Sequence, residues 1–225
     1  TLPEDMPAGI YRKKFKITDM SKQYVLTFLG TANNLEVYVN GSYVGYSEGT
    51  HNTSEYDITE YLTEGENELI ALSYRWSTGS YLEAQDMFRE NGIIRDVLLT
   101  KRGKTHIDDF HFDYKKVGES YKCALNVKVA GETDSYTLDV KLFDKDNTVY
   151  TNTVKADGNT SLDFELNNIK EWNAEIPSVY ELYITLKKDS EETETVRHIV
   201  GFKHIETETD LFKFNDKLIK FKGAN

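Results

Sequence analysis

The sequence has a single cysteine, Cys123, among its 225 residues. One cysteine excludes an internal disulfide framework and a zinc site built from several thiolates. Cys123 lies on the apolar face of a predicted strand, so we expect it to fill a core rather than to act as a nucleophile. The sequence also lacks any apolar run near the roughly 20 residues that a helix needs to span a bilayer. These absences exclude a disulfide-stabilised scaffold and a transmembrane helix.

An excess of basic residues is also missing. The chain carries 27 basic and 38 acidic side chains, which gives a net charge of −11. This balance argues against a nucleic-acid-binding protein, which normally shows a basic face, and against docking on anionic lipid. The first residues, Thr1 to Asp5, are polar and acidic and are followed by no apolar stretch, so no signal peptide is visible. The cytoplasm is therefore the expected compartment.

Strand patterns run through most of the chain. In residues 121–129 apolar side chains alternate with polar ones, which is typical of a half-buried antiparallel strand. Similar patterns recur around residues 110–114, 136–142, 148–154, 162–166, 180–186 and 194–200. About seven short strands in about a hundred residues predict an immunoglobulin-like β-sandwich.

The first hundred residues predict a second kind of β-sandwich. Strands are expected at 11–17, 24–29, 35–39, 43–46, 68–76 and 97–101. Asn40-Gly41 joins two of them and tolerates the positive φ angles of a tight hairpin turn. The capping-box-like spacing from Asp57 to Glu60 predicts one helical turn that ends before Gly65. Strands connected in this way favour a jelly roll, so the predicted fold class is all-β.

Three segments follow from these patterns. We expect a jelly-roll domain at residues 1–103, an immunoglobulin-like domain at 104–204 and a hairpin at 205–225. The hairpin pairs 211–214 with 219–222 around Asn215-Asp216. Two strands alone are marginal in water, so this hairpin predicts a further domain that it belongs to.

The segment 77–96 interrupts the strand rhythm. Twenty residues between two strands are far more than the usual four to six, and such loops are often functional. The segment combines carboxylates and an amide (Glu83, Gln85, Asp86) with the aromatic rings of Tyr81 and Phe88. Such groups suit a sugar, whose hydroxyls need hydrogen bonds and whose C–H faces stack on rings. The alternative is a loop held to its own domain by arginine–carboxylate pairs.

Other chemistry finds little support. Glu83 and Asp86 are close in sequence, but acids beside arginines keep low pKa values and make poor general acids, so the pair is not expected to be catalytic. The five histidines are scattered with no metal-ligand spacing. Trp172 offers a possible sugar platform, but the apolar residues around it favour a packing role.

A series of short motifs runs along nearly the whole chain. They comprise Gly9-Ile10-Tyr11, Val39-Asn40-Gly41, Val44-Gly45-Tyr46, Ser54 to Ile58, Gly65 to Leu69, Arg75 to Ser77, Ser80 to Glu83, Gln85-Asp86-Met87, Gly92 to Val97, Trp172 to Pro177 with Tyr180, Gly201 to Lys203, Asn215 to Lys217 and Lys222 to Asn225. In these motifs, which are collinear with those of the family, the chain resembles the non-catalytic front of a glycoside hydrolase family 2 enzyme of the lac-type β-galactosidase branch. The Gln-Asp-Met sequence of the long loop favours β-galactosidases over β-glucuronidases and β-mannosidases.

The resemblance implies a retaining enzyme whose two catalytic glutamates lie in a (β/α)8 barrel beyond Asn225. No catalytic residue is then expected in this chain, which would be inactive alone. Asp86 matches the family aspartate that contacts the galactosyl site and a bound sodium ion. Ala84 stands where relatives often have an acid, and Phe88 where they often have tryptophan.

The resemblance also implies the parent protein's partners. These are its own catalytic barrel, a galactoside substrate and further copies of itself in a homo-oligomer. No cofactor is required by this part, whereas sodium and magnesium are possible in the full enzyme. The upstream asparagine that relatives place before the first strand is expected to precede Thr1.

Two other functions stay open at this point. The chain could be an autonomous carbohydrate-binding module, since jelly rolls host lectins. It could also be a purely structural or oligomerisation module of another family 2 glycosidase, of the β-glucuronidase or β-mannosidase type. The affinity of the isolated chain for sugar distinguishes a carbohydrate-binding module from a part of an enzyme. The mass of the chain in solution tests whether it is an oligomerisation module.

Overall fold

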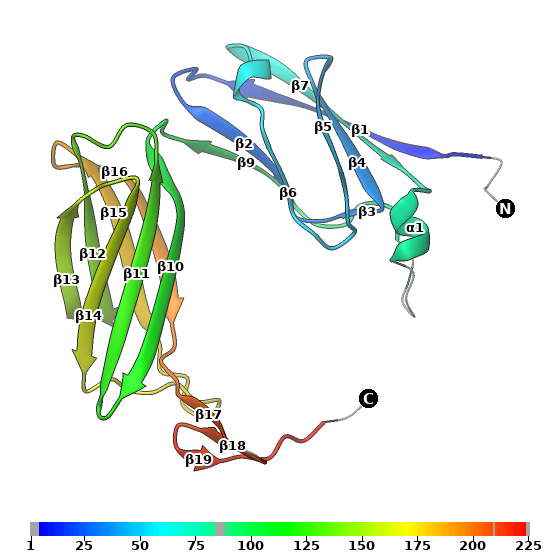
Figure 1. The fold of residues 1–225 in the computed structure, drawn as a ribbon. Coiled ribbons are helices and arrows are strands. Elements are labelled where there is room, and N and C mark those ends of the chain that lie inside the picture. Colours follow the sequence, from blue (N-terminus) through cyan, green and yellow to red (C-terminus); the bar gives the residue numbers. More distant parts are fainter. Residues whose placement is uncertain (1–4, 84–87, 89, 209, 224–225) are drawn as a thin grey trace. The chain divides into compact units, whose positions relative to one another are not determined.

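The computed structural model describes residues 5–83, 88, 90–208 and 210–223. Within these residues nearly all regular structure is β-strand, and the strands pair antiparallel, which confirms the all-β prediction. The chain divides into two compact units, Thr1–Lys104 and Thr105–Asn225, which are described separately below (Figure 1). None of the helices in the described residues is long and apolar enough to cross a membrane.

The first unit is built from two main sheets. One has the strand order β1-β7-β4-β5 and the other the order β6-β2-β9, and a two-stranded ladder pairs β3 with β8. The strands are β1 (Ala8–Ile17), β2 (Gln23–Phe28), β3 (Thr31–Ala32), β4 (Asn34–Val39), β5 (Ser42–Glu48), β6 (Ser54–Asp57), β7 (Gly65–Tyr74), β8 (Gly92–Ile93) and β9 (Val97–Arg102). Two short helices complete the unit, the 3-10 helix η1 (Thr59–Tyr61) and α1 (Thr78–Leu82).

Alternating side chains of the two sheets form the core of the first unit. Leu35, Val37 and Val39 of β4 are fully buried, and Leu26 and Phe28 of β2 belong to the same cluster. Because alternate residues of a strand point to opposite faces, one face of each sheet supplies this core. The strands expected in this part of the chain correspond to β1, β2, β4, β5, β7 and β9, whereas β6 was not predicted.

The Asn40-Gly41 hairpin forms as predicted between β4 and β5. Asn40 and Gly41 have φ angles of 50° and 80°, which is the pair of positive angles that a tight two-residue turn requires. The Asn40 amide donates to the Tyr61 carbonyl (2.9 Å) and the Asn67 side chain (2.7 Å), and its oxygen accepts from the Glu68 N–H (2.9 Å). The turn is therefore also fixed to η1 and β7.

The predicted helical turn after Asp57 is a 3-10 turn and ends earlier than expected. Asp57 accepts a hydrogen bond from the Thr59 N–H at 3.0 Å, and the turn ends at Tyr61. Gly65 has a φ of 98° and begins β7 rather than ending the helix. The N-cap is Ile58, which makes no side-chain capping bond, so the capping box that the spacing from Asp57 to Glu60 predicted does not form.

A groove opens along one side of the first sandwich. It has a volume of about 460 Å³ and lies between the two edge strands β1 and β9. Core residues such as Leu26, Phe28 and Ile58 form part of its wall, together with Val97, Leu98 and Leu99 of β9. Between 38% and 45% of the surface of these three β9 side chains is exposed.

The second unit contains a seven-stranded sandwich with an additional small sheet. Strands β10, β11 and β14 form one layer, and the order β13-β12-β15-β16 forms the other (Figure 1). The strands are β10 (His106–Val117), β11 (Ser120–Ala130), β12 (Tyr136–Asp144), β13 (Asn147–Lys155), β14 (Asn159–Asn167), β15 (Tyr180–Lys188) and β16 (Glu191–Val200). This crossing of the chain between two antiparallel sheets is the arrangement of immunoglobulin-like sandwiches.

The core of the second unit follows the predicted alternation. The apolar face of β11 is at most 4% exposed and consists of Tyr121, Cys123, Leu125, Val127 and Val129. Cys123 is buried as expected, and this burial raises the pKa of its thiol to about 12. A thiol in such a setting is inert, so the predicted packing role is confirmed.

The small sheet differs from the predicted hairpin in two ways. It has three strands in the order β17-β18-β19, with bounds Ile205–Glu208, Leu211–Phe214 and Lys217–Leu218. The second hairpin strand therefore begins at Lys217 rather than at Ile219, because the turn Asn215-Asp216 needs no further residues. Pairing with β17 gives the hairpin a neighbour that the sequence did not reveal.

Candidate functional site

A hollow of about 720 Å³ lies beside the segment 77–96 that interrupts the strand rhythm. Three stretches of the first unit line it: the turn at residues 49–52, Arg75 with Trp76 at the end of β7, and residues of α1. Phe88, Glu90 and Asn91 border it from the far part of the segment. The predicted functional loop therefore forms one wall of a cavity, with polar and aromatic side chains facing it.

The short helix α1 within this segment was not predicted from the sequence. It spans Thr78–Leu82, and at its start the Ser77 N–H donates to the Ser80 hydroxyl at 2.9 Å. Five helical residues give no usable 3.6-residue periodicity, so the sequence pattern could not distinguish them from a loop. The helix brings Glu83 to the edge of the hollow.

Asn33 joins the two ends of the segment. Its amide donates to the Arg75 carbonyl and to the Asn91 side chain, both at 3.0 Å, and its oxygen accepts from the Ser80 hydroxyl at 3.1 Å. Asn33 has a φ of 68°, a conformation that asparagine tolerates better than most residues. One side chain in the β3–β4 connection therefore ties both stems of the segment to the sandwich.

Glu83 is held by the opposite wall. One carboxylate oxygen accepts hydrogen bonds from the Thr50 hydroxyl (2.6 Å) and the Thr50 backbone N–H (3.1 Å). Both bonds lower the pKa of Glu83, and the bond from the Thr50 hydroxyl has the larger effect. A carboxylate stabilised in its ionised form makes a poor general acid. The low pKa was expected, but threonine rather than arginine causes it.

Arg95 is the arginine of the segment that the structure describes, and it contacts backbone carbonyls. It donates to the carbonyls of Leu29 and His51, each at 3.3 Å. Arg75 precedes the segment, and its guanidinium lies 5.3 Å from the centroid of the Trp76 ring. Among the described residues of the segment, Arg95 therefore makes carbonyl contacts in place of the expected arginine–carboxylate pair. Every residue has a backbone carbonyl, so the sequence cannot show which carbonyl accepts a hydrogen bond from an arginine.

Aromatic rings gather at the same hollow. Trp76 and Phe88 line it, and Phe88 is 94% exposed. The ring of Tyr81 lies outside the lining, with its centroid 6.4 Å from that of Trp76. Exposed rings beside amide and carboxylate groups can stack on the apolar face of a sugar while the polar groups bind its hydroxyls. The hollow therefore combines aromatic and polar groups, and sugar binding by it stays a prediction.

Asp86, the candidate site residue, lies outside the described residues together with Ala84, Gln85 and Met87. Glu83 and Phe88, which flank this stretch in the sequence, both border the hollow. The role of Asp86 stays a prediction, as does the absence of a catalytic pair in this chain.

Trp172 has the packing role that was favoured over a sugar platform. Its backbone N–H donates to the Phe202 carbonyl at 2.7 Å. Its ring packs edge-on against that of Phe214, with the ring centroids 6.0 Å apart. A Cβ on Gly201 would lie 3.1 Å from the indole, so the backbone passes directly against the ring. Trp172 therefore anchors the small β17-β18-β19 sheet to the end of the second sandwich.

One side-chain cluster was missed by the sequence analysis. His204, Glu206 and Asp216 have donor atoms within 4.8 Å of one another, close enough to hold a metal ion. His204 and Glu206 are near in sequence, but Asp216 arrives through the turn between β18 and β19. Only the strand register brings it close, so no ligand spacing was visible.

Family models match almost the whole chain. The model described as "Glycosyl hydrolases family 2, sugar binding domain" matches residues 1–103, and the model "Glycosyl hydrolases family 2" matches residues 105–203. The chain therefore belongs to glycosyl hydrolase family 2, and the family resemblance seen in its motifs is confirmed.

Curated relatives are β-galactosidases. The chain is 36% identical to that of Actinobacillus pleuropneumoniae over 225 residues, 36% identical to that of Streptococcus thermophilus and 30% identical to that of Kluyveromyces lactis. These matches cover 99–100% of this chain but only 21–25% of the relatives. The chain thus spans about a fifth to a quarter of their length, and it is homologous to the N-terminal region of such enzymes.

Solved structures show the same fold in other glycosidases. A β-glycosidase from Bacteroides vulgatus has a TM-score of 0.85 at 25% identity and covers 96% of this chain and 29% of its own. A β-glucuronidase from Bacteroides uniformis has a TM-score of 0.81 at 20% identity and covers 95% of this chain and 28% of its own. At 20% identity, the similarity to the β-glucuronidase supports the fold alone.

Proposed function

We propose that this chain is the non-catalytic front of a retaining β-galactosidase and that its segment 77–96 shapes the galactosyl pocket. Identity to curated β-galactosidases along the whole chain, 36% over 225 residues, carries this proposal. The hollow beside the segment, with its aromatic and amide groups, supports it. The catalytic glutamates would lie in a barrel beyond residue 225, and no proton transfer is assigned to this chain.

Asp86 is the residue proposed to contact the sugar. It would orient the galactosyl group directly or through a bound sodium ion, for which carboxylate oxygen is a suitable ligand. Glu83 would serve this arrangement by fixing the end of α1 to the Thr50 turn. Correct placement of a substrate by a remote contact accelerates a reaction without proton transfer, because it removes unproductive orientations.

The activity assay uses nitrophenyl glycosides and compares two proteins. One is this chain, and the other is a longer product of the same gene that includes a catalytic barrel. We expect no hydrolysis by this chain and a preference of the longer protein for the β-galactoside. A preference for a glucuronide or mannoside would contradict the galactosyl assignment, and hydrolysis by this chain would overturn the placement of the catalytic pair.

Substitution of Asp86 tests the residue itself. In the longer protein, Asp86→Asn and Asp86→Ala should lower kcat/KM by about 100-fold or more, because a misplaced substrate loses at least this much. Asp113→Asn is the matched control, since Asp113 is an exposed carboxylate of the second unit. Unchanged kinetics in both Asp86 variants, with folding verified by circular dichroism, would remove Asp86 from the site.

An autonomous carbohydrate-binding module is the second candidate, because the hollow exists within the first unit alone. Titration of galactose into the isolated chain separates the two functions. One wall of an enzyme pocket should bind galactose weakly or not at all, since small ligands need burial on most sides. Tight binding by the isolated chain would favour the module.

A further inference from the structure

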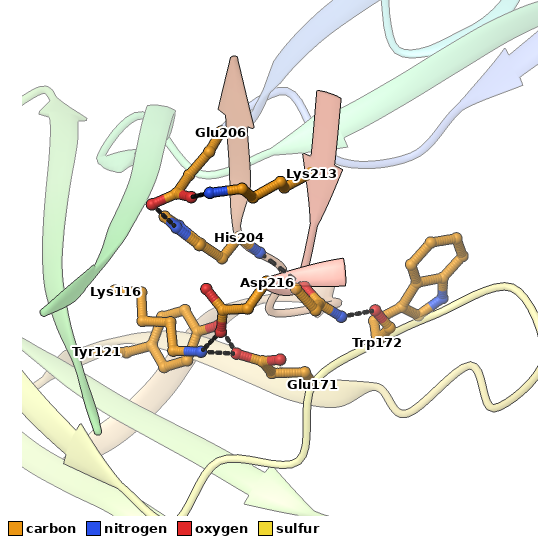
Figure 2. Close-up of polar contacts among 9 residues, drawn as sticks. Lys116, Tyr121, Glu171, Trp172, His204, Glu206, Lys213 and Asp216 are labelled. Carbon is orange, nitrogen blue, oxygen red and sulfur yellow. Dashed lines mark hydrogen bonds and ion pairs between the residues drawn. The ribbon is translucent and has the colours of Figure 1, made fainter. Parts of the chain in front are cut away.

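Charged side chains gather where the small sheet meets the second sandwich. Lys116 of β10 contacts Glu171 at 3.0 Å and Asp216 at 2.8 Å, and Tyr121 donates to Glu171 at 2.7 Å. Nearby, His204 Nε2 lies 3.1 Å from Glu206 Oε1, and Lys213 lies 3.5 Å from the other oxygen of Glu206. Figure 2 shows both groups of contacts converging from different elements.

Backbone contacts fix the positions of these side chains. The Asn215 N–H donates to the His204 carbonyl (2.8 Å), and the His204 N–H donates to the Asn215 side chain (2.9 Å). The Asn215 amide also donates to the Trp172 carbonyl at 3.0 Å. The turn that carries Asp216 is therefore attached to the segment that carries His204, and main-chain atoms of His204 make this attachment.

The spacing of three donor atoms fits a metal ion. Ligands at about 2.0–2.2 Å from a zinc-like ion lie about 3–3.5 Å from one another. The His204–Glu206 distance of 3.1 Å already has this value, and all three donors lie within 4.8 Å. Asp216 is 63% exposed on a turn, so an ion from solvent can reach its carboxylate.

Lysines contact one oxygen of each of the two carboxylates. Lys116 binds Oδ2 of Asp216, and Lys213 binds Oε2 of Glu206. With Glu171, three carboxylates face two ammonium groups, so this set of residues has one net negative charge while His204 is neutral. A net negative charge at this position favours the binding of a cation.

We propose that His204, Glu206 and Asp216 form a binding site for a divalent transition-metal ion of the zinc class. An imidazole nitrogen with two carboxylates suits zinc or cobalt, whereas calcium and magnesium prefer sites made of oxygen alone. Three protein ligands leave the other coordination positions to water. The ion would join the start of β17 to the β18–β19 turn and so fasten the small sheet.

Titration calorimetry with Zn²⁺ tests the site in this chain, produced without a histidine tag. We expect one equivalent of saturable binding that weakens more than tenfold in His204→Ala and in Asp216→Asn, because ligand loss costs at least as much as the loss of an outer-shell partner. His204→Ala keeps the main-chain bonds to Asn215, and thermal unfolding verifies that the variants fold. No saturable binding, or binding unchanged in both variants, would overturn the proposal.

His111→Ala is the matched control. His111 lies 3.0 Å from Asp113 on the same unit and therefore repeats the histidine–carboxylate pair of His204 and Glu206. Among the residues that the structure describes, no third metal-ligating side chain joins His111 and Asp113 in the way that Asp216 joins His204 and Glu206. The His111 pair should therefore not contribute to Zn²⁺ binding. Affinity within twofold of the parent chain supports the site. Equal loss in His111→Ala and His204→Ala would indicate general histidine binding and overturn it.

Two further measurements move in directions that a merely structural role would not produce. Lys116→Met removes the ammonium group that competes with the metal ion for Asp216, so it should tighten Zn²⁺ binding several-fold. Weaker binding would count against the proposal.

The second measurement uses Trp76→Phe, in which Trp172 is the remaining tryptophan. Co²⁺ should quench the fluorescence of Trp172 at the same molar ratio at which Zn²⁺ binding saturates. Tighter binding of Ca²⁺ or Mg²⁺ than of Zn²⁺ would contradict the assigned class of metal.

Discussion

Asn40 combines an unusual backbone conformation with three side-chain hydrogen bonds. Its φ of 50° suits asparagine, and its amide group joins the β4–β5 turn to η1 and β7. Asn40→Ala would lose the three bonds and strain the turn, because alanine adopts positive φ at a cost. We expect the first unit to lose about 1–3 kcal/mol of unfolding free energy. Urea denaturation followed by Trp76 fluorescence measures this loss.

Asn52→Ala provides the control for Asn40. Asn52 is an exposed asparagine of the same unit, and its backbone N–H rather than its side chain bonds to the Gly49 carbonyl. This substitution should change stability by less than about 0.5 kcal/mol, which is usual for surface positions. An equal loss in the two variants would show that the three Asn40 bonds contribute nothing specific.

Single residues differ in how far the sequence could predict their role. The Asn40-Gly41 turn was predictable because two adjacent residues carry the whole signal. The Glu83–Thr50 bond and the approach of Asp216 to His204 were not, because each depends on which segments fold against one another. Asp86 was assigned through family resemblance, and that assignment stays a prediction.

Asp139 links three strands of the second unit. This buried carboxylate of β12 accepts hydrogen bonds from Lys187 of β15 at 2.8 Å and from Thr153 of β13. The Lys187 bond is the main reason that the pKa of Asp139 is lowered. A lowered pKa in the folded state stabilises the protein above the unfolded pKa, and this contribution is lost as the pH falls through the folded value.

The stability of the second unit should therefore decrease below about pH 4, partly through Asp139. Asp139→Asn should cost about 1–3 kcal/mol at pH 7 and make the decrease below pH 4 shallower. Denaturation monitored by Trp172 between pH 2 and 7 measures both effects. The control is Asp163→Asn, an exposed carboxylate of β14. The same pH profile in Asp139→Asn and the parent chain would refute the linkage.

Elements were predictable in proportion to their length. Strands such as β11, with 11 residues, contain enough alternating positions to identify both the strand and its buried face. The two-residue strands β3 and β8 and the five-residue α1 do not, because their pairing and packing define them. The small sheet was predicted with two strands for the same reason, since β17 has only four residues.

At the scale of the whole molecule, the residues that the structure describes form two separate hydrophobic cores. One cluster is confined to residues of the first unit and the other to residues of the second. Leu182 is fully buried in the second core, so Leu182→Ala should destabilise that unit by about 2–5 kcal/mol. Because Trp76 and Trp172 belong to different units, single-tryptophan variants report each transition. We expect the Trp172 midpoint to fall and the Trp76 midpoint to stay unchanged.

The reciprocal variant completes this test. Val37 is fully buried in the first core, and Val37→Ala should lower the Trp76 midpoint alone. A shift of both midpoints in either variant would show that the two units unfold as one cooperative structure. The outcome also decides whether a single unfolding free energy describes this chain.

Fold class and family were the properties best predicted from the sequence. Alternating patterns distributed over the whole chain identify antiparallel sandwiches, and collinear motifs identify family 2, so local errors in single strands do not change either conclusion. The substrate side of the site depends on few residues in one segment. That segment follows no regular period, and its central residues, 84–87, lie outside the described structure.

The two edge strands beside the groove of the first unit differ in their protection against aggregation. β1 carries Arg12, Lys13, Lys14 and Lys16, and lysines on an edge strand oppose pairing with another chain. β9 begins with the exposed apolar residues Val97, Leu98 and Leu99 and becomes basic only at Lys101. In concentrated solution the chains should therefore begin to self-associate along β9. A single lysine introduced near the start of β9 would oppose this association in samples for crystallisation or NMR.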